Sequence, residues 1–152
     1  MLSRVVEGDH LRLSLPNERA ALEPTRLAVA DFLAAYAPSE ALRYQVELVI
    51  EEMLMNVVWH AFDDAAPHRI ALALRVEPAQ VVLDFEDDGV AFDPLQAPLP
   101  EPPVSIEAAV PGGLGLLLVR RMARAMTYER RDGRNRLTVT LAREPSGRVD
   151  GP

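Results

Sequence analysis

Three polar side chains recur at four-residue spacing in the otherwise apolar stretch "VIEEMLMNVVWHAF", residues 49–62. They are Glu52, Asn56 and His60, and at 3.6 residues per turn they lie along one side of a helix. A carboxylate there could accept a proton from a hydroxyl, an amide oxygen could bind Mg²⁺ beside phosphates, and an imidazole could donate to a phosphate oxygen. Alternatively, these residues only hydrogen-bond to neighbouring backbone groups, and the spacing alone favours neither interpretation.

A second motif, "LDFEDDGVAFDP", covers residues 83–94, where an apolar strand ends in acidic residues and a glycine. At the strand end, Asp87 could accept a hydrogen bond from an exocyclic amine such as that of adenine. Gly89 would let the backbone turn sharply and approach a ligand. Aspartates followed by glycine are also common in ordinary turns, so this motif alone is a weak signal.

A third motif, "PGGLGLLLVRRM", places Gly112, Gly113 and Gly115 at the start of an apolar helix. The free backbone N–H groups of a helix N-terminus can bind a phosphate. A dinucleotide fingerprint is excluded, because no strand comes immediately before and position 118 is leucine where a third glycine is required. The alternative is a glycine hinge without a ligand.

The elements around these motifs predict the fold class. Ser39 is the expected N-cap of the helix that carries the polar stripe, and Pro24 fits only in the first turn of the helix before it. The expected order is a strand (10–16), two helices (20–36 and 40–62), a strand hairpin (69–77 and 79–87), a helix (112–126) and two closing strands within 127–142. This order predicts an α+β two-layer sandwich, with helices packed on one face of a mixed, mainly antiparallel sheet.

Residues 1–143 are expected to form a single domain. The segment 90–111 contains six prolines and no periodicity, which is typical of a lid or a binding loop. A linker between two domains is the alternative, but the segments on either side are too small to be separate domains. Residues 144–152 are expected to be a disordered tail.

Composition excludes several classes of protein. The chain has 152 residues, 49% of them hydrophobic, and no cysteine, so a disulfide framework and a thiolate site are both excluded. With no signal-like leader or long apolar run, we expect a cytoplasmic protein without membrane contact. The net charge of −7 disfavours direct nucleic-acid binding.

One basic strip stands out, and it is either a solvated surface or a docking surface for an acidic protein. It consists of Arg120, Arg121, Arg124, Arg130, Arg131, Arg134 and Arg136.

Taken in order, the three motifs resemble those of the GHKL (histidine-kinase-like) ATPases. Over residues 8–143 the chain looks most like the bacterial anti-sigma-factor serine/threonine kinases of the partner-switching type. "EEMLMNVVWHAF" resembles the N box of that family, which implies Glu52 as the general base and Asn56 as the Mg²⁺ ligand. "EDDGVAFDP" resembles the adenine-binding box and "GGLGLLLVRRM" the phosphate-side glycine box. The resemblance thus implies an ATP-binding set of Asn56, His60, Asp87, Gly89, Gly112, Gly113 and Gly115.

The resemblance implies a kinase that binds Mg-ATP, phosphorylates a serine or threonine of an anti-sigma-factor antagonist and sequesters a sigma factor. Relatives are often homodimers. A nucleotide-responsive regulator of the same fold that binds a protein without catalysis is the alternative. Two departures from the family pattern bear on turnover more than on nucleotide binding: Ala91 stands where a second glycine is common, and "GRN" (133–135) replaces a Gly-Thr pair.

Overall fold

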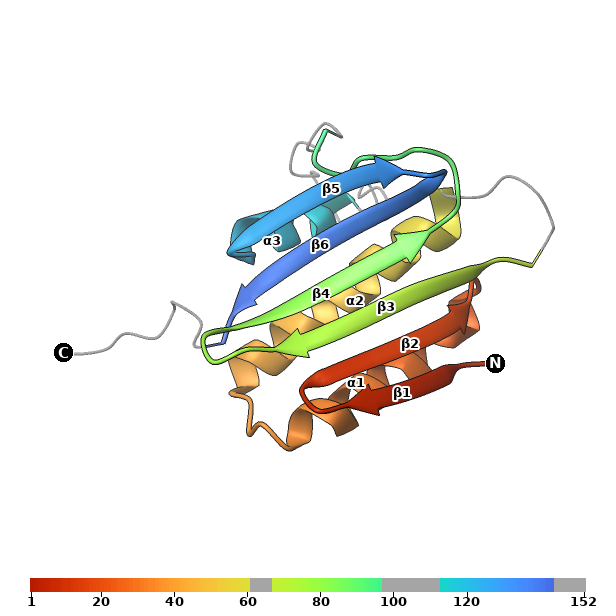
Figure 1. Ribbon diagram of the computed structural model, residues 1–152. Helices are drawn as coiled ribbons and strands as arrows, with labels where there is room; N and C mark the ends of the chain where they lie inside the picture. Colours follow the sequence, from red (N-terminus) through yellow and green to blue (C-terminus); the bar gives the residue numbers. More distant parts are fainter. Residues whose placement is uncertain (61–66, 97–112, 144–152) are drawn as a thin grey trace.

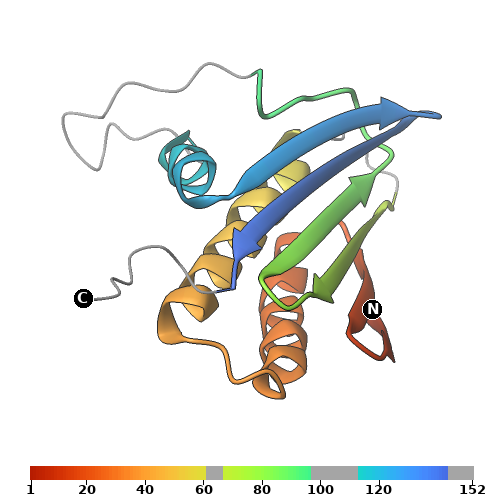
Figure 2. The same cartoon turned by 60° about the vertical axis from the view of Figure 1, so that its left-hand side comes forward.

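The computed structural model describes residues 1–60, 67–96 and 113–143, and these form two layers. One layer is a six-stranded sheet of order β1-β2-β3-β4-β6-β5, and the helices cover one of its faces (Figures 1 and 2). The strands are β1 (Ser3–Glu7), β2 (His10–Pro16), β3 (Arg69–Val76), β4 (Gln80–Asp87), β5 (Ala125–Arg131) and β6 (Arg134–Ala142). The helices are α1 (Leu22–Ala34), α2 (Glu40–His60) and α3 (Gly113–Met122), with a 3₁₀ turn at Arg19–Ala21.

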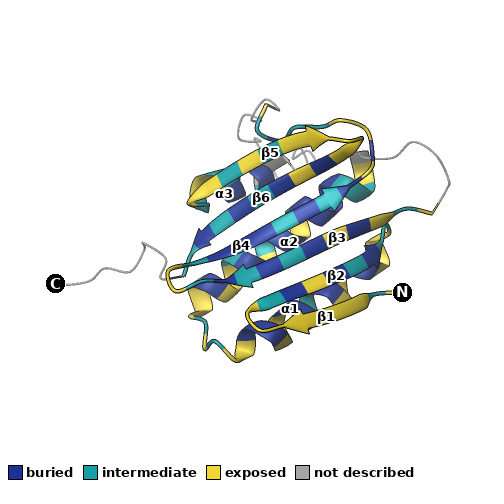
Figure 3. Cartoon of the chain, in the orientation of Figure 1, coloured by how far each residue is buried: buried dark blue, intermediate teal, exposed yellow. Residues whose placement is uncertain are grey.

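Alternating burial along the strands forms the core. Leu11, Leu13 and Leu15 of β2 are buried, as are Leu137 and Val139 of β6, while the residues between them are more exposed. Since successive side chains of a strand point to opposite faces, the apolar set lies under the helices and the polar set on the open face. Figure 3 shows this alternation as dark and light bands along β2, β3 and β6.

Helix α2 is the central element of the helical layer and runs behind the middle strands of the sheet (Figure 1). Ser39 caps it, because its Oγ accepts a hydrogen bond of 3.0 Å from the backbone N–H of Leu42, as the sequence predicts. Val46, Val49 and Ile50 on its inner side are at most 1% exposed. The helix is therefore anchored along its length, and the residues near its C-terminal end keep a fixed position relative to the sheet.

The predicted α+β two-layer class is confirmed, and every strand pair among the described residues is antiparallel. The β3–β4 hairpin is also confirmed. At the β5–β6 turn, Asp132 and Gly133 both have positive φ, of 52° and 76°, which is the geometry expected of an Asp-Gly hairpin turn.

Two predictions about elements were wrong. Strand β1 was not expected; all five of its residues are exposed and it pairs only with β2, so it has no alternating apolar pattern to reveal it. The helix predicted over 112–126 ends at Met122, and β5 begins at Ala125. The Arg124 N–H donates to the Thr140 carbonyl at 2.8 Å, so pairing with β6 overrides the helical preference of this Ala-, Arg- and Met-rich segment.

Much of the expected lid (90–111), the tail (144–152) and Gly112 lie outside the described residues. Within the part of the chain that is described, no helix is long and apolar enough to cross a membrane.

Candidate functional site

A pocket opens between the C-terminal half of α2 and the ends of β4, β5 and β6. Its walls are largely apolar and include Met53 and Val57 of α2, Phe85 of β4 and Leu137 of β6. It holds about 440 Å³ of empty space, its open mouth included. Apolar walls with a few convergent polar groups are typical of sites that bind small molecules.

Asp87, the last residue of β4, supplies a carboxylate to this pocket and is only 6% exposed. Its Oδ1 accepts hydrogen bonds from the Gly89 backbone N–H at 2.8 Å and from Nδ2 of Asn135 at 3.0 Å. These two bonds hold the carboxylate in the wall of a largely apolar cavity. There it can accept a hydrogen bond from an N–H donor of a ligand.

Asn56 reaches the same pocket from α2 and is also buried. Among the described residues, two buried side-chain atoms have no hydrogen-bond partner: Nδ2 of Asn56 and Oδ1 of Asn17. Only Asn56 lines the pocket. Leaving a buried polar group unsatisfied costs about 1–3 kcal/mol, so this N–H₂ group is free to donate a hydrogen bond to a ligand in the pocket.

Glu52 lies one turn before Asn56 and is brought against the start of α3. A Cβ added to Gly115, the third residue of α3, would lie 1.9 Å from Cδ and Oε1 of Glu52. Glycine is therefore the residue that leaves room for this carboxylate. Partial burial, aided by the neighbouring Glu51 carboxylate, raises the pKa of Glu52 above its ordinary value.

The structure thus brings Asn56 and Asp87 to one pocket. Gly89 lies outside the pocket wall and is bonded to Asp87, and Glu52 and Gly115 lie against each other between α2 and α3. His60 is the last residue of α2 and Gly113 the first of α3, but their side-chain surroundings are not described. Among the described residues, no group of three or more His, Cys, Asp or Glu could hold a metal ion. The amide oxygen of Asn56 suits Mg²⁺, which keeps most of its water and uses one or two protein oxygens together with phosphates.

Sequence reasoning missed two polar residues of the pocket, Asn135 and Tyr128. Tyr128 donates a hydrogen bond to Oδ1 of Asn135, which links β5 to β6. The sequence did contain a signal for Asn135. It alternates with the same two-residue period as the buried Leu137, Val139 and Leu141 of β6, so it points to the same face of the sheet. A polar residue in phase with a buried apolar set is a candidate for a specific role.

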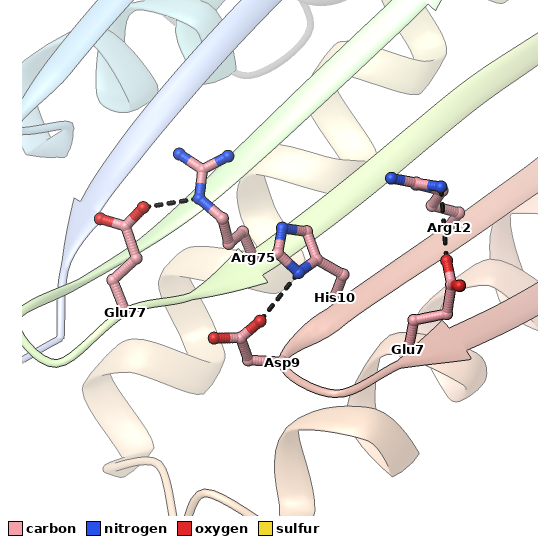
Figure 4. A network of polar contacts seen from close by, with 6 residues as sticks. All are labelled: Glu7, Asp9, His10, Arg12, Arg75 and Glu77. Carbon is pink, nitrogen blue, oxygen red and sulfur yellow. Dashed lines mark hydrogen bonds and ion pairs between the residues drawn. The ribbon is translucent and has the colours of Figure 1, made fainter.

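The open face of the sheet carries a second hollow, of about 860 Å³ with its open side included, but it has a different character. Charged residues line it, and they pair with one another, as in Arg136 with Asp84 at 3.4 Å. Figure 4 shows the adjoining pairs at the strand ends, including Arg12 with Glu7 and Arg75 with Glu77. We take this face to be a solvated polar surface.

Three arginines of the predicted basic strip form hydrogen bonds within the protein. Arg124 bonds to Gln80, Arg130 to the Gly89 carbonyl and Arg134 to Glu86. These contacts favour the interpretation of a solvated and internally paired surface.

An α+β sandwich with a pocket between its central helix and the sheet has the form of a small-molecule-binding domain. The matching family model is that of the histidine kinase-like ATPase domain, over residues 15–141, and the chain belongs to this family. Among curated proteins, it is 43% identical to the serine/threonine-protein kinase BtrW of Bordetella bronchiseptica over 107 residues. That match covers 70% of this chain and 75% of BtrW. The family resemblance found in the sequence is therefore confirmed.

Proposed function

We propose that the protein is a serine/threonine protein kinase that binds Mg-ATP in the pocket between α2 and the sheet. The observation that carries this proposal is the position of Glu52, a half-buried carboxylate at the first turn of α3, one turn from the pocket residue Asn56. The similarity to BtrW, itself a serine/threonine-protein kinase, supports the same activity.

In this proposal Asp87 recognises the nucleotide base. Its carboxylate accepts a hydrogen bond from the exocyclic amine of adenine, while Met53, Val57 and Phe85 enclose the ring. Apolar walls strengthen such a bond, because little water competes for the carboxylate.

The phosphates are then bound on the α3 side. The first N–H groups of α3, from Gly113 to Gly115, provide free donors for phosphate oxygens. The amide oxygen of Asn56 is the proposed protein ligand of Mg²⁺, which when bound would neutralise charge on the phosphates. His60 is proposed to donate to a phosphate oxygen.

Glu52 is the proposed general base. The substrate hydroxyl oxygen forms a bond to the γ-phosphorus, the bond from that phosphorus to the β–γ bridging oxygen breaks, and ADP leaves with the electron pair. Glu52 takes the hydroxyl proton. Its raised pKa makes the ionised carboxylate a better proton acceptor than that of an exposed glutamate.

We further propose that the acceptor is an anti-sigma-factor antagonist and that the protein also sequesters a sigma factor, as the family resemblance implies. The experiment is to incubate the protein with Mg-ATP and a small antagonist domain, and to locate transferred phosphate by mass spectrometry. Phosphoserine or phosphothreonine on the antagonist would support the kinase. If ATP binds but no phosphate is transferred to any antagonist offered, the protein is instead a nucleotide-responsive regulator without catalysis.

Replacing Asp87 with asparagine tests the base assignment. In Asp87→Asn, the new amide oxygen can accept the same two hydrogen bonds from Gly89 and Asn135. The new N–H₂ group then takes the place of Oδ2 and presents a donor to the base. We expect ATP affinity to fall about 10–100-fold, because the adenine amine then meets a donor. GTP affinity should fall less than ATP affinity, because guanine has no 6-amino group to lose its acceptor.

The matched control is Asp88→Asn, the adjacent aspartate, whose side chain is 51% exposed. Isothermal titration calorimetry with both nucleotides should show no change in this variant. An equal loss of ATP and GTP affinity in Asp87→Asn would contradict the assignment.

A further inference from the structure

Asn135, near the start of β6, is only 6% exposed and has several hydrogen-bond partners. Its Nδ2 donates to Oδ1 of Asp87 at 3.0 Å and to the Val90 carbonyl at 2.8 Å. Its Oδ1 accepts from the Tyr128 hydroxyl, from Nη1 of Arg130 at 3.2 Å and from the Phe92 backbone N–H at 3.4 Å. One side chain thus joins the end of β4, the loop that follows it and the β5–β6 hairpin.

These partners permit only one orientation of the Asn135 amide. If oxygen and nitrogen were exchanged, the oxygen would face a carboxylate and a carbonyl, both acceptors. The nitrogen would then face Arg130 and the Phe92 N–H, neither of which can accept a hydrogen bond. Asn135 therefore always presents a donor to Asp87.

This donor occupies one of the two carboxylate oxygens of Asp87. Oδ1 already accepts from the Gly89 N–H, and the bond from Asn135 gives it a second donor. Oδ2 has no hydrogen-bond partner among the residues that the structure describes. The pocket therefore offers a ligand a single carboxylate acceptor.

We propose that Asn135 determines the preference for adenine over guanine. It does so by donating to Oδ1 of Asp87, so that this oxygen cannot also bind the base. This inference rests on the proposed function, and Asn135 is a positioning residue in it, since it acts through Asp87. A single acceptor is sufficient for the N6 amine of adenine. Guanine presents two adjacent donors, N1–H and the 2-amino group, and a carboxylate binds both only when both of its oxygens are available.

The test compares ATP, GTP and inosine triphosphate by calorimetry, with Mg²⁺ present, in wild type and Asn135→Ala. The wild type should prefer ATP to both other nucleotides by at least about tenfold. In Asn135→Ala, the ratio of ATP to GTP affinity should fall by about tenfold, which is the discrimination that one bidentate contact provides. Inosine triphosphate should gain less than GTP, because it lacks the 2-amino group.

Thr138→Val is the matched control, because Thr138 lies in β6 like Asn135 but does not line the pocket. The change removes the hydrogen bond from Thr138 to Asp84. It should leave the nucleotide ratio unchanged. Asn135→Ser, a smaller change, is measured in place of Asn135→Ala if thermal melting shows that the alanine variant does not fold.

The outcomes separate this inference from the proposed function. A wild type that binds none of the three nucleotides would overturn both. A wild type that binds ATP and GTP equally well would overturn the role of Asn135, as would equal losses of both affinities in the Asn135 variants. A fall in the ATP-to-GTP ratio with a smaller gain for inosine triphosphate would establish it.

Discussion

Replacing Glu52 with glutamine is expected to abolish phosphoryl transfer while Mg-ATP affinity stays within about threefold of wild type. A positioned general base contributes about 10²–10⁴-fold to the rate, and glutamine cannot take a proton. Glutamine has the same length, so it can keep the packing against Gly115. Single-turnover phosphorylation of the antagonist and calorimetric titration of ATP would measure the two effects separately.

Glu51→Gln is the matched control, because Glu51 is the exposed neighbour on the same helix. Its carboxylate helps to raise the pKa of Glu52, so removing that charge should lower this pKa. Transfer requires ionised Glu52, so the rate should fall as pH drops through its pKa, and in Glu51→Gln this fall should occur at lower pH. Normal transfer by Glu52→Gln would show that Glu52 is not the base.

The second large effect is expected from Gly115→Ala. The added Cβ would lie within 2 Å of the Glu52 carboxyl group, so that flexible side chain must rotate away. Transfer should fall by about 10²-fold or more, because the base leaves its position. Stability should hold or rise, since alanine in a helix is favoured over glycine by about 0.5–1 kcal/mol.

Thermal melting and transfer rates would be measured on the same samples of this variant. Full activity in a stable Gly115→Ala protein would contradict the account of Glu52, because the carboxylate cannot keep its position beside an alanine. The proposed phosphate contact of Gly115 is tested separately, by whether ATP affinity also changes.

The main elements could be predicted because their patterns are local. Ser39 before a helix, apolar alternation in 69–87 and the Asp-Gly turn each depend on a few neighbouring residues, and the structure has all three. Strand β1 is wholly exposed and the start of β5 is rich in Ala, Arg and Met, so neither segment has an apolar alternation, although each pairs with the next strand along the chain.

The candidate site divides in the same way. Asn56 and Asp87 could be found because each lies in a compact motif, and the structure gives both to one pocket. The close approach of Glu52 and Gly115 joins residues 63 positions apart, and Asn135 meets Asp87 across 48 positions. Contacts between residues so far apart in the sequence follow from how the strands and helices pack, so only the fold reveals them.

The central claim, that the pocket binds Mg-ATP through Asn56, is tested most directly by calorimetric titration of Mg-ATP into wild type and Asn56→Ala, with and without EDTA. Asn17→Ala is the control, since Asn17 also carries a buried atom without a partner but does not line the pocket. We predict metal-dependent binding in wild type and Asn17→Ala that is lost in Asn56→Ala. A well-folded wild type that binds no ATP, or an Asn56→Ala variant that binds it as tightly with the same dependence on metal, would contradict the account.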